Sequence, residues 1–185
     1  MPCRHNRAFA RSGFCSRDKG INSMSYILEP MTEKHRKPVI DIFNYYIETN
    51  FAFPETKVDY DFFDHFLDMS KGYPALVAKA ESGDAVGFAL LHQYSWANSF
   101  KRSALITYFI LPQHTRKGLG KMMLDKLIAQ ARSMGVDHLL ANISSDNERS
   151  LQFHRKHGFH ECGRFQEVGR RFGKSFDVVW MIRRI

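Results

Sequence analysis

The sequence predicts a single α/β domain with a mixed, mostly antiparallel central sheet flanked by helices. Segments with strand and helix periodicity follow one another as β-α-α-β-β-β-α-β-α-β-β. A chain of 185 residues is long enough for one domain with a sizeable core. Its 44% hydrophobic and 25% charged residues are typical of a globular protein, and no apolar run approaches the roughly 20 residues that span a bilayer.

The N-terminal part of this domain is expected to hold one strand and two helices. Residues 25–31 (SYILEPM) alternate as a strand does. Residues 39–47 place apolar side chains at helical spacing, and Pro38 fits this helix only in its first turn. Asp59 is expected to cap a second helix over residues 60–69.

The rest of the chain alternates strands and helices. Residues 103–111 (SALITYFIL) are mostly apolar and β-branched, which predicts a central strand buried on both faces. The other expected elements are hairpin strands over 74–80 and 85–94, a helix ending near Met134, a strand over 137–143, a helix over 147–157, and closing strands over 160–170 and 174–182.

The formal net charge of +8 indicates an anionic partner. Residues 1–23 carry five Lys or Arg residues against Asp18 alone, so about half of the excess lies there. We interpret this segment as a disordered or non-native extension, in preference to an organellar transit peptide, and residues 24–185 as the domain. The mildly basic domain favours a small anionic ligand, and no nucleic-acid or membrane partner is expected.

The cysteines argue for a reducing compartment. Cys3, Cys15 and Cys162 form neither a paired framework nor a metal-binding spacing. We therefore expect a cytoplasmic protein with no metal site.

A glycine-containing loop precedes the expected central helix, in ILPQHTRKGLGKMMLDKLIAQA. Gly118 and Gly120 allow a ligand to approach the backbone, and the following helix directs its free N–H groups and dipole toward an anion. Arg116 and Lys117 add positive charge. Taken alone, the loop fits a tight strand-to-helix turn equally well, since it matches neither the P-loop nor the dinucleotide fingerprint.

A second segment, SDNERSLQFHRKHGF, follows the next strand. With the glycine loop it resembles the GNAT acetyltransferases, which use acetyl-coenzyme A. IFNYYIETNFAFPETKV, GYPALVA and VGRRFGKSFDVVWM look like the branch of phosphinothricin and methionine-sulfoximine N-acetyltransferases. The resemblance extends over nearly all of residues 24–185, and it implies a GNAT-type fold and a homodimer.

The resemblance also implies how acetyl-coenzyme A is held. In the family the loop binds the pyrophosphate and the central strand offers backbone N–H groups. Asn147 is implied to hydrogen-bond the pantetheine arm; it can also cap its own helix, and both roles can hold at once. The implied cofactor-binding residues are Tyr108, Phe109, Ile110, Arg116, Lys117, Gly118, Leu119, Gly120, Lys121 and Asn147. His154 is the implied catalytic residue, which protonates or hydrogen-bonds the leaving thiolate; the alternative is a packed histidine without a proton role.

Three positions depart from the family pattern. Thr115 stands where Gln or Arg is usual, Leu105 stands at the position of the usual catalytic glutamate, and Ser95 replaces an arginine that some members use for the substrate carboxylate. The expected substrate-binding residues are Phe53, Glu55 and Tyr94, with Phe51 and Trp96 as further apolar wall. Glu55 is a candidate base, or a cap of the next segment.

We therefore expect an N-acetyltransferase that transfers the acetyl group of acetyl-coenzyme A to the amine of a small molecule, an amino acid or an analogue, by direct attack. A peptide N-terminus or a polyamine as acceptor, and a coenzyme A-binding module without catalysis, remain the alternatives. The identity of the base is open.

Overall fold

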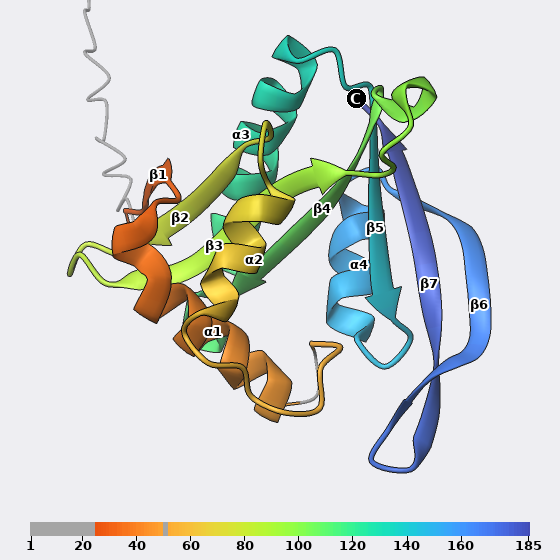
Figure 1. The fold of residues 1–185 in the computed structure, drawn as a ribbon, viewed down its shortest axis with the longest axis horizontal. Helices are drawn as coiled ribbons and strands as arrows, with labels where there is room; N and C mark the ends of the chain where they lie inside the picture. The colour runs from red at the N-terminus through yellow and green to blue at the C-terminus, as the bar shows by residue number, and fades with distance from the viewer. Residues whose placement is uncertain (1–24, 50–51) are drawn as a thin grey trace, which may run out of the picture.

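The computed structural model describes residues 25–49 and 52–185, which form one mixed sheet of seven strands with helices on both faces (Figure 1). The predicted extension over residues 1–23 lies outside the described residues. The strands are β1 (Ile27–Pro30), β2 (Ala75–Lys79), β3 (Ala85–Gln93), β4 (Ser103–Ile110), β5 (His138–Ser144), β6 (His160–Arg171) and β7 (Lys174–Arg184). The helices are α1 (Arg36–Glu48), α2 (Phe62–Met69), α3 (Leu119–Ser133) and α4 (Glu148–Lys156).

The strands lie in the order β1-β2-β3-β4-β5-β7-β6, and β4 and β5 form the parallel pair of the described sheet. All other neighbours are antiparallel. The predicted mixed, mostly antiparallel sheet and the predicted order of elements are therefore confirmed. Short 3-10 turns over Glu33–His35, Asn98–Phe100 and Pro112–His114 were not predicted.

Two cores lie on opposite faces of the sheet. On one face α3 packs its buried side chains against residues such as Leu76 and Ala89. On the other face α1 and α2 pack against Val77 and Phe88. Because successive side chains of a strand point to opposite faces, neighbouring residues of β2 and β3 divide between the two cores.

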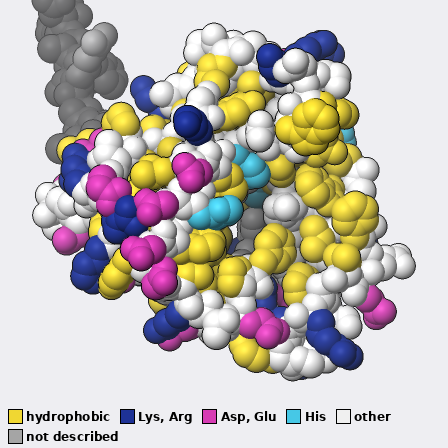
Figure 2. Space-filling view, in the orientation of Figure 1, with side chains coloured by type: hydrophobic (Ala, Val, Ile, Leu, Met, Phe, Trp, Pro, Cys, Tyr) yellow, Lys and Arg dark blue, Asp and Glu magenta, His cyan; other side chains and the backbone are white. Residues whose placement is uncertain are grey.

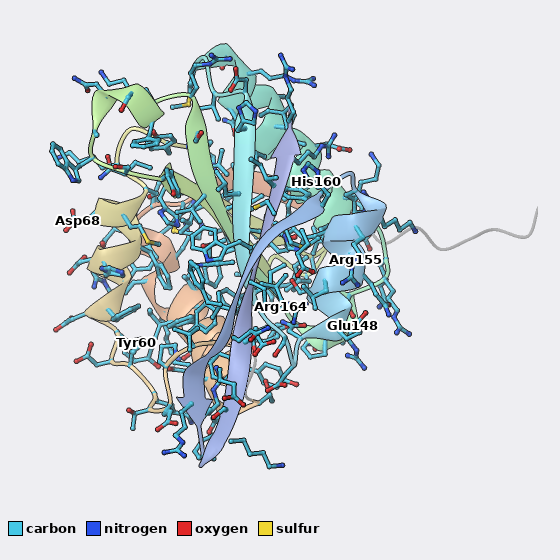
Figure 3. All side chains as sticks on the ribbon, turned by 90° about the vertical axis from the view of Figure 1, so that its right-hand side faces the viewer. Tyr60, Asp68, Glu148, Arg155, His160 and Arg164 are labelled. Atoms are coloured by element: carbon cyan, nitrogen blue, oxygen red, sulfur yellow. The ribbon has the colours of Figure 1, made fainter. Side chains whose placement is uncertain are left out.

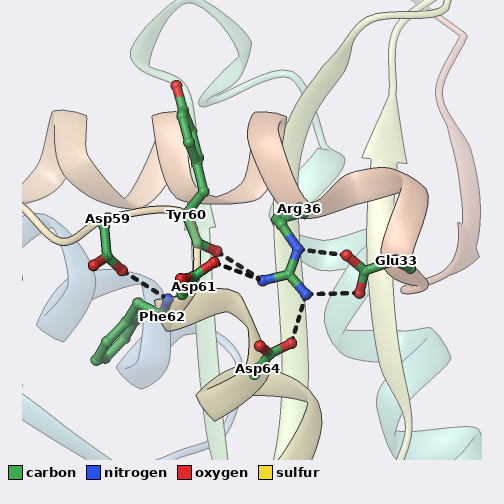
Figure 4. Close-up of polar contacts among 7 residues, drawn as sticks. All are labelled: Glu33, Arg36, Asp59, Tyr60, Asp61, Phe62 and Asp64. Atoms are coloured by element: carbon green, nitrogen blue, oxygen red, sulfur yellow. Dashed lines mark hydrogen bonds and ion pairs between the residues drawn. The ribbon is translucent and has the colours of Figure 1, made fainter.

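A charged contact fixes the start of α2 against α1. The guanidinium of Arg36 donates to the Tyr60 carbonyl oxygen at 3.0 Å and to Oδ1 of Asp64 at 2.6 Å (Figure 4). The Asp59 carboxylate accepts the N–H of Phe62 at 3.2 Å. The predicted N-cap at Asp59 is therefore wrong: α2 begins at Phe62 with Asp61 as its N-cap, and Asp59 instead closes the turn over residues 60 and 61 that precedes the helix.

The two closing strands form a long ribbon at one edge of the sheet, next to α4 (Figure 3). Nearly all of β6 is exposed, and Arg164 on this strand donates to Asp177 of β7 at 3.0 Å. The tip of the ribbon reaches the segment after α1: Arg171 donates to the carbonyl oxygen of Ala52, and the N–H of Phe172 donates to Glu55 at 3.1 Å. The ribbon therefore positions the loop that precedes α2.

Candidate active site

β4 and β5 diverge in the middle of the sheet. Their pairing covers Ser103–Leu105 and His138–Leu140, and beyond these residues β4 pairs with β3 while β5 pairs with β7 (Figure 1). A cavity of about 320 Å³ lies at the divergence and includes residues 106–109 and 141–144 in its wall. Residues 104–106 and 110 of β4 are buried but residues 107–109 are partly exposed, so the prediction of a strand buried on both faces is wrong where β4 lines the cavity.

The wall toward α1 and α2 is mostly apolar. One face of α2, at helical spacing, contributes Phe62, His65, Phe66 and Met69. Phe43 and the predicted Phe53 also lie in the wall. Figure 2 shows histidine side chains in a central hollow that hydrophobic side chains surround. An apolar cavity with a few polar groups is the usual form of a small-molecule site.

The glycine loop has the geometry of an anion site. Gly118 precedes α3 with a φ of 85°, in the left-handed region that glycine adopts without strain, and a Cβ there would meet no atom within 4 Å. The first N–H groups of α3 have no partner within the helix, and they and the helix dipole favour an anion. Arg116 and Lys117 are exposed beside this end.

Other predicted cofactor residues have different surroundings. Gly120 lies against the ring of Phe153 on α4, so the loop and α4 are in contact. Leu119 is buried in the core, where it anchors the start of α3. Lys121 is exposed and pairs with Asp125. Of the predicted set on β4, Tyr108 and Phe109 line the cavity, and the carbonyl oxygen of Ile110 accepts the Tyr46 hydroxyl.

Asn147 lines the cavity and precedes α4. Its Oδ1 accepts the N–H of Ser150 at 3.1 Å, so the predicted cap is present. The Nδ2 of the same amide makes no hydrogen bond to the described residues and remains available to a ligand. One side chain can therefore hold both roles.

This arrangement allows the two roles of Asn147 to be separated. Asn147→Asp keeps the oxygen that caps α4 but replaces the amide donor with a carboxylate oxygen. We therefore expect an unchanged melting temperature and an affinity for acetyl-coenzyme A that is about tenfold lower. Asn147→Ala loses both and should also lose about 1 kcal/mol of stability. Thermal unfolding and calorimetric titration of the two variants check this; equal affinity losses without a stability difference would contradict it.

His154 is buried on α4, where it holds the hydroxyl of Tyr108. Its Nδ1 lies 2.7 Å from the carbonyl oxygen of Ser150, which can only accept, so Nδ1 carries the proton. Its Nε2 lies 2.8 Å from the Tyr108 hydroxyl, which therefore donates to it. Burial lowers the pKa of His154 to about 4 and raises the pKa of Tyr108. The predicted catalytic histidine is thus neutral, and both of its nitrogens are engaged.

The low pKa of His154 makes stability depend on pH. The unfolded chain takes up this proton near pH 6.5 and the folded chain near pH 4, so the stability contributed by the neutral form is lost as the pH falls through that window. Between about pH 7 and about pH 5 the wild type should lose about 2 kcal/mol more than His154→Gln. Urea unfolding of both proteins at the two pH values measures this difference. Equal losses of unfolding free energy in the two proteins would show that His154 is not buried as a neutral imidazole.

Several predicted acceptor residues lie elsewhere. Glu55 is exposed, accepts the N–H of Phe172 and is not part of the cavity wall. Tyr94 packs edge-on against Trp180 and Phe100 outside the cavity. The side chain of Trp96 is 89% exposed. Phe51 lies outside the described residues.

Two histidines of the cavity wall, His65 and His92, were not predicted from the sequence. His92 is on β3 and His65 is on α2. Strand periodicity carried a usable signal, because His92 is two and four residues beyond the buried Leu90 and Phe88, on the face that α1 and α2 cover. In residues 25–49 and 52–185, no cluster of three His, Cys, Asp or Glu side chains could hold a metal ion.

No helix in the described part of the chain is long and apolar enough to cross a membrane.

Comparison with known proteins relates this site to acetyl transfer. The Escherichia coli K12 L-amino acid N-acyltransferase MnaT is 34% identical over 110 residues, 60% of this chain and just under two thirds (63%) of that protein. A Streptomyces coelicolor phosphinothricin N-acetyltransferase is 29% identical over 84% of this chain and 94% of its own length. The Salmonella typhimurium protein yncA, solved with its cofactor acetyl-CoA, superposes with a TM-score of 0.79 at 26% identity, over 86% of this chain and 94% of that one.

The family model described as "Acetyltransferase (GNAT) family" matches residues 39–159. The match extends from within α1, which packs beside the apolar wall of the cavity, through the glycine loop to Phe159 after α4. It covers more than half of the chain, and the chain therefore belongs to the GNAT acetyltransferase family.

Proposed function

We propose that this protein is an N-acetyltransferase that transfers the acetyl group of acetyl-coenzyme A to the amine of a small molecule, an amino acid or an analogue. The observation that carries the proposal is the cavity at the divergence of β4 and β5, which has an apolar wall toward α1 and α2 and includes Asn147, Ser150 and His154. The neighbouring Phe153 of α4 contacts Gly120 at the start of α3. The L-amino acid and phosphinothricin acetyltransferases among the relatives support the choice of acceptor.

The residues present fit the donor. The N–H groups that begin α3, with Arg116 and Lys117, suit a pyrophosphate, and the Nδ2 of Asn147 suits an amide carbonyl. Leu111 donates its N–H to Val86 on β3, so the alternation of a strand directs the N–H groups of Ile110 and Tyr108 toward the gap. Acetyl-coenzyme A, when bound, supplies an activated thioester carbonyl.

Two groups of the chain can stabilise the charge that develops on transfer. The strand N–H groups polarise the carbonyl oxygen, an effect worth about 3 kcal/mol where water is excluded. The Tyr108 hydroxyl donates its one proton to Nε2 of His154 in this structure, and that O–H can turn to the departing sulfur instead. Its raised pKa keeps it protonated at neutral pH. In this proposal His154 positions the Tyr108 hydroxyl and does not itself protonate the thiolate, unlike the role implied by the family resemblance.

Calorimetric titration with acetyl-coenzyme A, followed by thiol release with a panel of amines, tests the proposal. Binding and turnover with amino acids or their analogues are the expected results. Turnover confined to peptides or polyamines would show that these, and not amino acids, are the acceptors. Tight binding of acetyl-coenzyme A without turnover would show that the protein is a coenzyme A-binding module. Absence of binding would overturn the proposal.

A homodimer and a cytoplasmic location belong to the same proposal. The exposed face of β6, with Phe165 and Val168 more than half exposed, offers an apolar surface for a second copy. Light scattering after size exclusion measures the oligomeric state.

A further inference from the structure

Two titratable groups of the described cavity wall have no part in the proposed mechanism, His65 and His92, and His92 is the more buried of the two. It lies near the end of β3, opposite Leu105 of β4 in the antiparallel register. Opposed residues of an antiparallel pair share a face of the sheet, with their Cβ atoms about 5 Å apart. His92 therefore lies beside Leu105, the position where related enzymes carry a glutamate, and on the face that forms the acceptor wall.

His92 also lies at the point where the sheet divides. Leu105 is the last residue of β4 that pairs with β5, and the cavity wall begins at the next residue of the strand. Further along β4, Tyr108 lies against His154. A reacting carbonyl held between these two ends thus has the tyrosine on one side and His92 on the other.

Among the described residues, the cavity wall includes no Asp, Glu, Lys or Arg side chain that could compete as a base. The imidazoles that these residues contribute to the wall are those of His65, His92 and His154. His154 is engaged by Ser150 and Tyr108, and His65 is exposed on the outer part of the wall. The half-buried His92 is the imidazole that lies within the cavity and is not held by these partners.

We infer that His92 is the general base that accepts the proton of the acceptor amine, in place of a carboxylate. The inference depends on the proposed acetyl transfer. His92 takes one proton from the ammonium ion and passes it to solvent; the neutral nitrogen then forms the C–N bond as the C–S bond breaks. The second proton leaves the nitrogen for the sulfur, which gives the amide and the thiol.

The electrostatics agree with this role. Burial lowers the pKa of His92, a backbone hydrogen bond at Gln93 opposes the shift, and His65 lowers the pKa further. The groups facing His92 are Leu105 and Thr107 from β4 and His65 from α2, with Tyr108 and His154 across the cavity. His92 is therefore neutral at physiological pH and able to accept a proton.

The test compares three histidine variants with the wild type. His92→Gln should lower kcat about 100-fold with an ordinary alkyl amine and leave the affinity for acetyl-coenzyme A unchanged. His65→Gln should lose less than about threefold, because it leaves the inner imidazole in place. His160→Gln, on the outer ribbon away from the cavity (Figure 3), is the matched control and should match the wild type.

A second acceptor separates proton transfer from packing. An amine whose own pKa lies below the assay pH is already neutral, so His92→Gln should turn it over within about threefold of the wild type. Equal losses with both amines would overturn the inference, as would an unchanged kcat with the alkyl amine. If His92→Gln does not fold, His92→Asn is measured instead. In the wild type, kcat should fall at acid pH as His92 becomes protonated; the same fall in the His92→Asn variant would also overturn the inference.

These outcomes are distinct from failure of the proposed function. Failure of the function appears as a wild type that does not bind acetyl-coenzyme A or acetylates no amine. Failure of the inference appears as an active wild type whose His92 variants remain active.

Discussion

Gly120→Ala is expected to weaken acetyl-coenzyme A binding about tenfold, and Gly120→Val about 100-fold or more. A Cβ at this position would lie 3.0 Å and 3.3 Å from two atoms of the Phe153 ring, so the ring must give by a few tenths of an ångström, and the larger valine side chain must displace it further. The added side chain also narrows the approach to the N–H groups at the start of α3, where we place the pyrophosphate. Helix propensity works in the opposite direction, since alanine favours a helix by about 1 kcal/mol over glycine. The loss therefore appears in binding more than in stability.

Gly163→Ala is the matched control for this series. Its Cβ would meet the Trp180 side chain at 4.0 Å, an ordinary van der Waals contact on the outer ribbon. Calorimetric titration of the alanine pair should show an affinity change in Gly120→Ala alone. Equal affinity in the two variants would mean that the contact between the loop and α4 does not shape the donor site.

Tyr108→Phe is expected to lower kcat about 100-fold while the KM for acetyl-coenzyme A changes little. The substitution removes the hydroxyl that we place at the departing sulfur and leaves Nε2 of His154 without its donor. The ring itself remains, so its stacking on His154, at a centroid distance of 5.5 Å, is kept.

Two comparisons separate this chemistry from a loss of packing. Tyr60→Phe removes the hydroxyl of a surface tyrosine that donates to Asp41, and its kcat should match the wild type. His154→Gln should lower kcat less than Tyr108→Phe, because the hydroxyl remains but is no longer held. Steady-state kinetics measure all three. A His154→Gln enzyme impaired more than Tyr108→Phe would assign the proton chemistry to the histidine.

Most of the fold was predictable because its signals are local. The alternation in residues 85–94 and the helical spacing in residues 39–47 match β3 and α1 to within a few residues. Pro38 is the third residue of α1, in the first turn, as its missing N–H requires. The divergence of β4 from β5 was not predictable, since strand pairing depends on tertiary contacts that a single sequence does not display.

The positions of Gly118 and Asn147 in the fold were easier to predict than the residues of the cavity wall. Gly118 and Asn147 are tied to helix ends, and helix ends follow from short sequence patterns. Glu55 was proposed for its place in a loop, but a backbone N–H from a residue 117 positions away holds it outside the cavity wall. His92 was not predicted because its place beside Leu105 follows from the pairing of two strands, which a single sequence does not display.

The attachment of the β6–β7 tip to residues 52–55 makes acceptor choice adjustable from a distance. The donor side is built from β4, α3 and α4, whereas the loop beside the acceptor wall is held by Arg171 and Phe172 at the turn of the outer ribbon. Under the proposed function, substitutions at that turn would therefore change the choice of acceptor and leave the affinity for acetyl-coenzyme A unchanged.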